Sequence, residues 1–302
     1  IKDADEFIVA QREGYQIVNY LVNKPDTFPP VTDIHSAIRR ECRGMVFDDK
    51  GEILHRRLHK FFNVNERAET LYEEIDLSQP HWILEKLDGS MITPLVLEHG
   101  IRWATKMGVT DVSMQAEVFV VHHPQYIALA EELSAMGVTP TFEWCSRKNR
   151  IVVDHPEDRL VLLTMRHNIS GKYVPYHIVA DFAKRYFIEV VQRYPGTVES
   201  MESLVTNIRE ETVGEGWIIV FKDGHMVKIK NEAYVLMHKV KDRVRYERNL
   251  VAALINAEID DLKAFMAVED FQRVEEYESQ FWTDVDTYTQ SIYMFIDTAI
   301  TH

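Results

Sequence analysis

Short runs of apolar residues, separated by turn residues, dominate the sequence between residues 44 and 230, and no convincing strand pattern follows residue 231. Runs of this length, bounded by turns such as Asp48-Asp49-Lys50-Gly51, predict β-strands joined in hairpins. After residue 231 the apolar residues recur at three- and four-residue spacing, which predicts helices to about residue 299. The pattern therefore predicts an α+β body over residues 1–238 and a small all-helical C-terminal domain over residues 239–302.

The predicted elements of the body are three helices and several groups of strands. A helix is predicted over residues 2–13, followed by an extended segment over residues 15–22. Two further helices are predicted over residues 113–121 and 125–136. Strands are predicted at 45–47, 52–54, 81–86, 91–97, 101–106, 141–145, 160–165, 173–179, 216–221 and 225–230.

The charged residues are unevenly distributed. The 302 residues include 34 Lys and Arg against 48 Asp and Glu, a formal charge of −14, which argues against a protein that coats nucleic acid non-specifically. Basic residues nevertheless gather at 56–60, 147–150, 228–230 and 239–248, which is compatible with one basic groove on a bipolar surface. No apolar run approaches the roughly 20 residues that cross a bilayer, and two cysteines make no disulfide framework. We therefore expect a cytoplasmic protein without a membrane partner.

The stretch Glu85-Lys86-Leu87-Asp88-Gly89-Ser90 carries the strongest indication of chemistry. It places a lysine at the end of an apolar strand, where burial of an ammonium group is costly unless a partner compensates. The Asp-Gly-Ser turn brings the backbone close to whatever this lysine faces. A lysine in a partly dry pocket beside other cations can act as a neutral nucleophile. The alternative is an ordinary surface hairpin in which these residues occur by chance.

Lys228 and Lys230 alternate along a predicted strand, so that both side chains point to one face. If that strand lies beside the one that ends at Lys86, three ammonium groups converge. Such a cluster neutralises a triphosphate and favours an uncharged, reactive amine. Glu215 opens the partner strand of the same hairpin, where its carboxylate could hold Mg²⁺ through water. The alternatives are an edge strand protected by lysines and a solvated loop acid.

Further motifs flank the Lys86 stretch in a fixed order: Glu41-Cys42-Arg43-Gly44, Lys60-Phe61-Phe62-Asn63, Phe142-Glu143-Trp144, Asn149-Arg150-Ile151-Val152, Glu215-Gly216-Trp217 and Lys228-Ile229-Lys230. Together with that stretch, the ordered set resembles the covalent lysyl-nucleotidyltransferase superfamily of ATP-dependent ligases and capping enzymes. The two upstream motifs are similar to those of the RNA ligase 1 family, best known from bacteriophages. The resemblance covers about residues 41–231. It implies an ATP-grasp-like nucleotidyltransferase domain of antiparallel sheets flanked by helices.

The resemblance also implies a role for each matching position. Lys86 would attack the α-phosphorus of ATP, release pyrophosphate and become a lysyl–AMP phosphoramidate, while Lys228 and Lys230 would assist by gripping the α-phosphate. The other implied nucleotide contacts are the backbone of Glu85, the ribose-binding Arg43 and Glu143, and the basic positions Lys60 and Lys106. Glu215 would bind the metal ion or its water, with Mg²⁺ as the expected ion and Mn²⁺ as the alternative.

In the later implied steps, AMP moves to an RNA 5′-phosphate and a 3′-hydroxyl then displaces it, which serves RNA repair. The expected partners are therefore ATP and RNA with these two ends, with tRNA among the candidates. We expect a monomer, in the host cytoplasm if the chain comes from a phage. The acidic C-terminal domain is a poor phosphate-binding surface, so the basic segment 239–248 is the expected RNA contact.

Three alternatives stay open. A capping-type guanylyltransferase would use GTP instead of ATP, and a DNA ligase would join DNA ends. Both carry an OB-fold barrel after the last motif, whereas the segment after Lys230 is predicted to be helical. A non-catalytic nucleotide- or RNA-binding relative would keep the pocket without needing a nucleophile. The intact set Lys86, Glu143, Glu215, Lys228 and Lys230 favours an enzyme.

Overall fold

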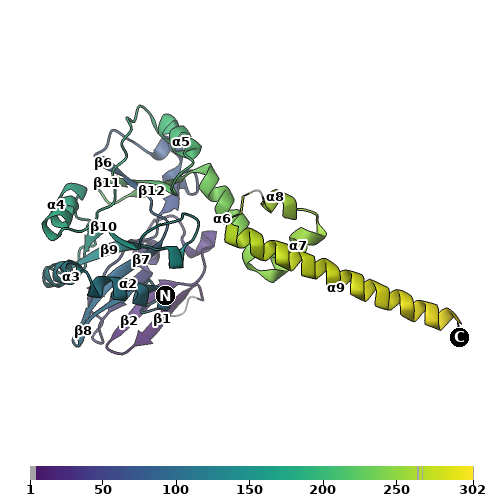
Figure 1. Cartoon of the computed structure of the whole chain (residues 1–302). Helices are drawn as coiled ribbons and strands as arrows, with labels where there is room; N and C mark the ends of the chain where they lie inside the picture. Colours follow the sequence, from purple (N-terminus) through teal and green to yellow (C-terminus); the bar gives the residue numbers. More distant parts are fainter. Residues whose placement is uncertain (1–4, 264, 267, 302) are drawn as a thin grey trace. The chain divides into compact units, whose positions relative to one another are not determined.

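The computed structural model describes residues 5–263, 265–266 and 268–301, and the chain divides into two compact units, Ile1–Glu232 and Ala233–His302 (Figure 1). Helix α6 (Glu232–Arg245) begins at this division. The predicted boundary at residue 238 therefore lies inside a helix, and the assignment of separate functions to residues 1–238 and 239–302 stays a prediction.

Three four-stranded sheets form the framework of the first unit, with the strand orders β1-β2-β3-β4, β10-β9-β7-β8 and β5-β12-β11-β6 (Figure 1). Neighbouring strands are antiparallel except β5 and β12, which run parallel. The strands are Phe7–Arg12 (β1), Tyr15–Tyr20 (β2), Arg43–Phe47 (β3), Ile53–His55 (β4), Phe62–Asn63 (β5), His81–Glu85 (β6), Ser90–Leu97 (β7), Gly100–Ala104 (β8), Val138–Cys145 (β9), Arg159–His167 (β10), Gly216–Phe221 (β11) and Met226–Lys230 (β12).

Helices cover the two larger cores of this unit. Helices α2, α3 and α4 contact the β10-β9-β7-β8 sheet, and α5 contacts β11 and β12. On α5, Leu204, Val205 and Ile208 are buried at three- and four-residue spacing against Ile219 and Val227 of the sheet. The helices are Ile34–Glu41 (α1), Asp111–Val121 (α2), Gln125–Ala135 (α3), Tyr176–Tyr186 (α4) and Met201–Glu210 (α5). The α+β prediction is confirmed.

The predicted N-terminal helix over residues 2–13 is wrong where the structure describes it. Residues 7–12 form β1, which pairs with β2 in the register Phe7↔Tyr20 to Arg12↔Tyr15. Gly14 lies in the turn with a φ of +76°, a conformation that glycine adopts without strain. Cross-strand pairing through this tight turn outweighs the weak helical spacing of the sequence. Residues 2–4 lie outside the described residues.

The predicted strand over residues 173–179 is also wrong in its second half. Helix α4 begins at Tyr176, directly after Pro175, a residue type that suits the first positions of a helix. Val179 and Ala183 are buried four residues apart, so that the helix presents one apolar face to the core. Tyr173 makes only a single bridge, to Arg166.

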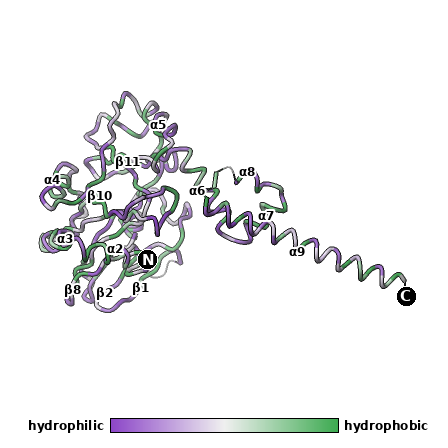
Figure 2. Tube along the Cα trace, in the orientation of Figure 1, coloured by the Kyte–Doolittle hydropathy of each residue, from purple (hydrophilic) through white to green (hydrophobic). Residues whose placement is uncertain are grey.

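The second unit is helical throughout its described residues, as predicted. Its helices are α6, Glu247–Ile255 (α7), Ile259–Lys263 (α8) and Val268–Thr301 (α9). A core forms from Val240, Val244, Leu250, Ala253, Leu254, Ile259, Leu262 and Val274. Every side chain from Trp282 to Ile300 is exposed, and hydrophobic and hydrophilic residues alternate along α9 (Figure 2). Among the described helices, none is both long enough and apolar enough to cross a membrane.

Two glycines at strand ends provide a test of the close packing at β11. Gly216 and Gly100 both have positive φ, 137° and 124°. A Cβ at Gly216 would lie 2.1 Å from the carbonyl oxygen of Ile229, whereas one at Gly100 would meet no atom within 4 Å. We therefore expect Gly216→Ala to lower the free energy of unfolding by at least about 2 kcal/mol more than Gly100→Ala. Urea unfolding of both variants measures the difference, and equal losses would contradict close packing at β11.

Candidate active site

The central element of the candidate site is strand β11, which lies between β6 and β12. β12 is therefore not the neighbour of the strand that ends at Lys86, and the adjacency that we considered from the sequence is not met. The register places Trp217 opposite Glu85 and Gly216 opposite Lys230. The Lys86 backbone N–H also donates a 2.8 Å hydrogen bond to the Gly216 carbonyl oxygen. Three motifs thus meet at one edge of the sheet.

Glu215 joins two of the predicted lysines at that edge. Its carboxylate Oε2 lies 2.5 Å from Lys86 Nζ, and its Oε1 lies 2.8 Å from Lys230 Nζ. The Glu215 side chain is only 4% exposed, so that it is no solvated loop acid. A buried carboxylate needs such partners, because an unpaired one would cost several kcal/mol. The two carboxylate oxygens of Glu215 therefore hold the amines of Lys86 and Lys230 close together.

A pocket of about 280 Å³ opens beside this edge and contains most of the predicted residues. We call it the basic pocket. It is lined by Tyr20, Arg43, Leu58, Lys60, Phe61, Glu85, Lys86, Leu87, Gly89, Met91, Glu143, Leu163, Ile218, Lys228 and Lys230. The structure thereby brings together Arg43, Lys60, Glu85, Lys86, Glu143, Lys228 and Lys230. Of the remaining predicted residues, Glu215 contacts two of these lysines and Lys106 contacts Tyr20.

Two groups in the basic pocket have strongly displaced pKa values. Burial, together with the positive charges of Lys60 and Lys86, lowers the pKa of Lys228 to about 7. Burial raises the pKa of the Glu143 carboxyl to about 8, against the opposing effect of Lys86 and with a further rise from Glu215. At neutral pH, Glu143 is therefore largely uncharged and Lys228 is poised to gain or lose a proton.

Aromatic side chains in the pocket were not among the predicted site residues. Phe61 lies 5.5 Å from Lys228 Nζ and 6.0 Å from the Arg43 guanidinium carbon, measured to its ring centroid. The motif Lys60-Phe61-Phe62-Asn63 contains this residue, but only its lysine was assigned a role from the sequence. Faces of aromatic rings attract cations at these distances, so Phe61 helps to place two of the cationic groups.

Tyr20, at the end of β2, is the second missed residue, and no local motif marks it. Lys106 Nζ lies 4.2 Å and Lys60 Nζ 5.4 Å from its ring centroid. Burial raises the pKa of Tyr20, but the charges of Arg43, Lys106 and Lys60 outweigh burial and leave the pKa below its ordinary value. Lys106 does not line the basic pocket itself, but it contacts Tyr20, which does.

Asp88 holds the loop that carries Lys86. It is 3% exposed, and its Oδ2 accepts 2.7 Å hydrogen bonds from the backbone N–H groups of Val152 and Val153. Asn149 Nδ2 donates to Ser90 Oγ at 2.8 Å, a second link between the same two loops. The motif 149–152 thus has a structural function, because it fixes the turn after the nucleophile candidate.

Glu41 of the first motif belongs to a buried network behind the pocket. Its carboxylate pairs with both terminal nitrogens of Arg166, at 2.7 and 2.9 Å. Arg166 also donates to the Arg57 carbonyl oxygen at 2.7 Å. Bidentate pairs of this kind fix orientation as well as distance. The network therefore positions β3, and with it Arg43, relative to β10.

Within the described residues, no group of three or more His, Cys, Asp or Glu side chains could enclose a metal ion. Mg²⁺ commonly keeps several waters and is held by one or two carboxylates together with substrate phosphates. The Glu215 carboxylate, which lies beside the pocket between two of its lysines, fits that mode of binding.

A family model described as RNA ligase matches residues 41–244, more than half of the chain, and the chain therefore belongs to the RNA ligase family. The predictions of family and enzyme class are confirmed. A relative from Thermovibrio ammonificans, assigned as an RNA ligase, is 29% identical over 85% of this chain and 67% of its own length. A relative from Autographa californica nuclear polyhedrosis virus, assigned as a bifunctional polynucleotide kinase/RNA ligase, is 28% identical over 74% of this chain. The match spans only 34% of that viral protein.

Solved structures show the same fold at low sequence identity. An archaeal ATP-dependent RNA ligase is 14% identical, with a TM-score of 0.53 over 90% of this chain and 72% of that one. A Naegleria gruberi RNA ligase variant with ATP and Mn is also 14% identical, with a TM-score of 0.50 over 61% of this chain and 58% of that one. The predicted nucleotidyltransferase-type fold of the first unit is thereby confirmed.

The displaced pKa values predict opposite pH effects on stability for two substitutions. Because the folded pKa of Glu143 is raised to about 8, ionisation of this carboxyl costs stability only as the pH rises above 4.5. Because the folded pKa of Lys228 is lowered to about 7, its charge costs stability below pH 7, and the cost vanishes near 10.5. We expect Glu143→Gln to raise the free energy of unfolding by about 1–3 kcal/mol near pH 9 and to leave it unchanged near pH 4.5.

For Lys228→Met, we expect the free energy of unfolding to rise by a similar amount near pH 6 and to stay unchanged near pH 10.5. These two pH values follow from the folded and ordinary pKa values of Lys228. Urea unfolding across this pH range measures both variants against the unsubstituted protein. If the free energy of unfolding varied with pH in the same way for all three proteins, the two displaced pKa values would be contradicted.

The Asp88 contacts predict that Asp88→Ala uncouples the Lys86 loop. Two backbone N–H groups, one buried and one partly buried, would lose their acceptor, which costs about 1–3 kcal/mol of stability. Asp48→Ala is the matched control, because Asp48 Oδ1 also accepts from two backbone N–H groups, of Lys50 and Glu52, but in an exposed turn. The control should lose under about 1 kcal/mol in urea unfolding. A loss as large in the control as in Asp88→Ala would refute a special role for this loop.

Proposed function

We propose that this protein is an ATP-dependent RNA ligase that joins RNA 5′-phosphate and 3′-hydroxyl ends through a lysyl–AMP intermediate. The observation that supports it most is the position of Lys86, held at 2.5 Å by Glu215 in a pocket that also contains Lys228 and Lys230. A non-catalytic nucleotide-binding protein would not need a nucleophilic amine at the position of Lys86. Family membership supports the reaction class, and the solved relative that contains ATP and Mn supports the cofactors.

In the proposed first step, Lys86 Nζ forms a bond to the α-phosphorus of ATP, and the bond to the pyrophosphate oxygen breaks. The amine must lose a proton before it attacks, and Glu215 Oε2 is an acceptor within 2.5 Å. Lys228 and Lys230 would balance the charge that develops on the phosphate oxygens. Mg²⁺, with Mn²⁺ as the alternative, would be held by Glu215 through a bound water and would supply further positive charge beside the phosphates.

The remaining pocket residues would bind and orient the nucleotide. Arg43 has a buried terminal nitrogen, Nη1, without a hydrogen-bond partner among the described residues, which suits a ribose hydroxyl. Glu143, largely uncharged at neutral pH, could donate or accept a hydrogen bond at the ribose without repelling phosphate. Lys60 and Lys106, placed by Tyr20, would contact the outer phosphates. The backbone of Glu85 would meet the edge of adenine.

The later steps transfer AMP to the RNA 5′-phosphate and then replace it by the 3′-hydroxyl. The second unit carries its basic residues mainly on α6 and the start of α7, at Lys239, Lys241, Arg243, Arg245 and Arg248. Helix α9, in contrast, carries eight Asp and Glu side chains and a single basic one, Arg273. We therefore propose segment 239–248 as the RNA contact of this unit. RNA repair, with broken tRNA among the substrates, a monomeric state and a cytoplasmic location remain part of the proposal.

Incubation with ATP labelled in the α-phosphate tests the first step. With Mg²⁺ present, we expect an acid-labile label on the protein that is lost in Lys86→Ala. Lys50→Ala, in the exposed hairpin turn after Asp48, is the control and should label normally. Absence of label in the unsubstituted protein would refute the proposal and favour a non-catalytic relative. Label from GTP alone would indicate a capping-type guanylyltransferase.

The labelled protein then serves to identify the acceptor. Transfer of AMP to linear single-stranded RNA, to tRNA nicked in its anticodon loop, or to nicked duplexes would distinguish the substrate classes. Joining of DNA ends in preference to RNA ends would favour the DNA ligase alternative and contradict the proposal.

A further inference from the structure

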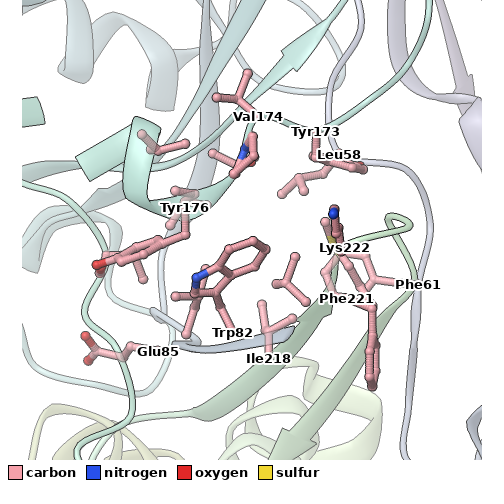
Figure 3. A pocket seen from close by; sticks show the side chains of 18 residues that line it. Leu58, Phe61, Trp82, Glu85, Tyr173, Val174, Tyr176, Ile218, Phe221 and Lys222 are labelled. Atoms are coloured by element: carbon pink, nitrogen blue, oxygen red, sulfur yellow. The ribbon is translucent and has the colours of Figure 1, made fainter. Parts of the chain in front are cut away.

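An apolar chamber adjoins the basic pocket, and none of the roles proposed above uses it (Figure 3). Its volume is about 70 Å³. Strands β6, β11 and β12 form one wall, and β10 with residues 173–179 and Val191 forms the other. Figure 3 shows an open centre surrounded by the side chains of Trp82, Tyr176, Val174, Leu58 and Ile218.

The chamber and the basic pocket occupy two ends of one sheet face. On β6, Trp82 and Leu84 line the chamber, and Lys86, the next residue on that face, lines the basic pocket. On β12, Met226 lines the chamber, and Lys228 lines the basic pocket in the same way. The residues that line both cavities are Leu58, Phe61, Glu85, Leu163 and Ile218. The cavities therefore meet at the end of β6, where Glu85 lies.

The interior of the chamber offers few groups to a polar ligand. The Tyr176 hydroxyl donates to the Val191 carbonyl oxygen at 2.8 Å, and the Tyr173 hydroxyl lies 2.7 Å from His59 Nδ1. Both hydroxyls are thus already engaged. Lys222 is exposed, and the only other charged lining residue is Glu85, at the boundary with the basic pocket. Small apolar cavities stay dry and bind apolar groups.

We propose that this chamber is a binding site for a small apolar group attached to the amino edge of adenine, at N6 or C2. The inference rests on the proposed function, in which the Glu85 backbone meets the edge of the base. Because Glu85 lies where the cavities meet, that edge faces the chamber and the triphosphate faces the lysines. A dry engineered cavity of about 150 Å³ holds benzene, so a chamber of about 70 Å³ suits a chain of about three carbons. The ligand class is therefore an N6- or C2-alkylated adenine nucleotide.

Three propylated forms of ATP, labelled in the α-phosphate, test the inference against ATP itself. We expect N6-propyl-ATP or C2-propyl-ATP to label the protein with a KM within about threefold of that for ATP. C8-propyl-ATP carries its substituent on the opposite edge of the base, and its KM should rise by at least about tenfold, a loss of about 1.4 kcal/mol. Equal use of all three would indicate an open base site and overturn the inference.

Two substitutions fill the chamber from opposite walls, Val174→Phe and Val220→Phe. Each should keep labelling by ATP and raise the KM for the accepted propyl form by at least about tenfold. Val118→Phe, on the exposed surface of α2, is the matched control and should change neither KM. If one filling variant fails to fold, the other still tests the inference. Thermal unfolding shows which variants are folded.

The outcomes separate the two proposals. Label from ATP without label from the N6 and C2 forms overturns the chamber site and leaves the proposed function intact. Use of a propyl form that is unaffected by either folded filling variant also overturns the chamber site. A protein that takes no label from ATP overturns both.

Discussion

The proposed site depends on a single buried carboxylate. Glu215 stands directly before β11, and its two oxygens contact lysines from the strands on either side. A carboxylate this deeply buried is tolerated only with compensating charge, and two ammonium groups would repel each other without it. The ion pairs therefore stabilise the edge of the sheet and position the proposed nucleophile through the same contacts.

The strand alternation that brings the lysines together also separates two environments. Side chains at every second position of a strand share a face, and along β6 and β12 that face changes from apolar to cationic within a few residues. One sheet thereby presents an apolar surface and a cationic surface without a break between them. An adenine nucleotide with an apolar substituent on its base has the same polarity, with the substituent at one end and the phosphates at the other.

The sequence predicts those parts of the structure that local patterns encode. The hairpin before Lys230, the helical C-terminal unit and the pocket positions of Lys86 and Lys228 follow from spacing and motif order. Tyr20 could not be predicted, because it acquires its neighbours only when the β2 end meets Lys60 and Lys106 from distant segments. The N-terminal helix was wrong for a related reason, since strand pairing across a tight turn is not visible in a single segment.

Sheet order is likewise a property of the whole chain. The motifs indicate which residues meet, but not that β11 separates β6 from β12, because strand neighbours are chosen by packing of the complete sheet. Asp88 illustrates the same limit. Its motif suggests a turn, while its partners, the amides of Val152 and Val153, lie more than sixty residues away. Such long-range contacts fix the geometry that the motif only marks.

A chain with a formal charge of −14 can still form a positive pocket, because the negative charges of Glu215 and Glu143 are neutralised there by different means. Glu215 is neutralised by direct pairing with two lysines. Glu143 is neutralised by burial, which raises its pKa to about 8 and keeps its proton at neutral pH. Lys228, with a pKa lowered to about 7, can take up a proton when a phosphate approaches. The field at the pocket is therefore set by local burial and pairing, and the net charge of the chain has little influence on it.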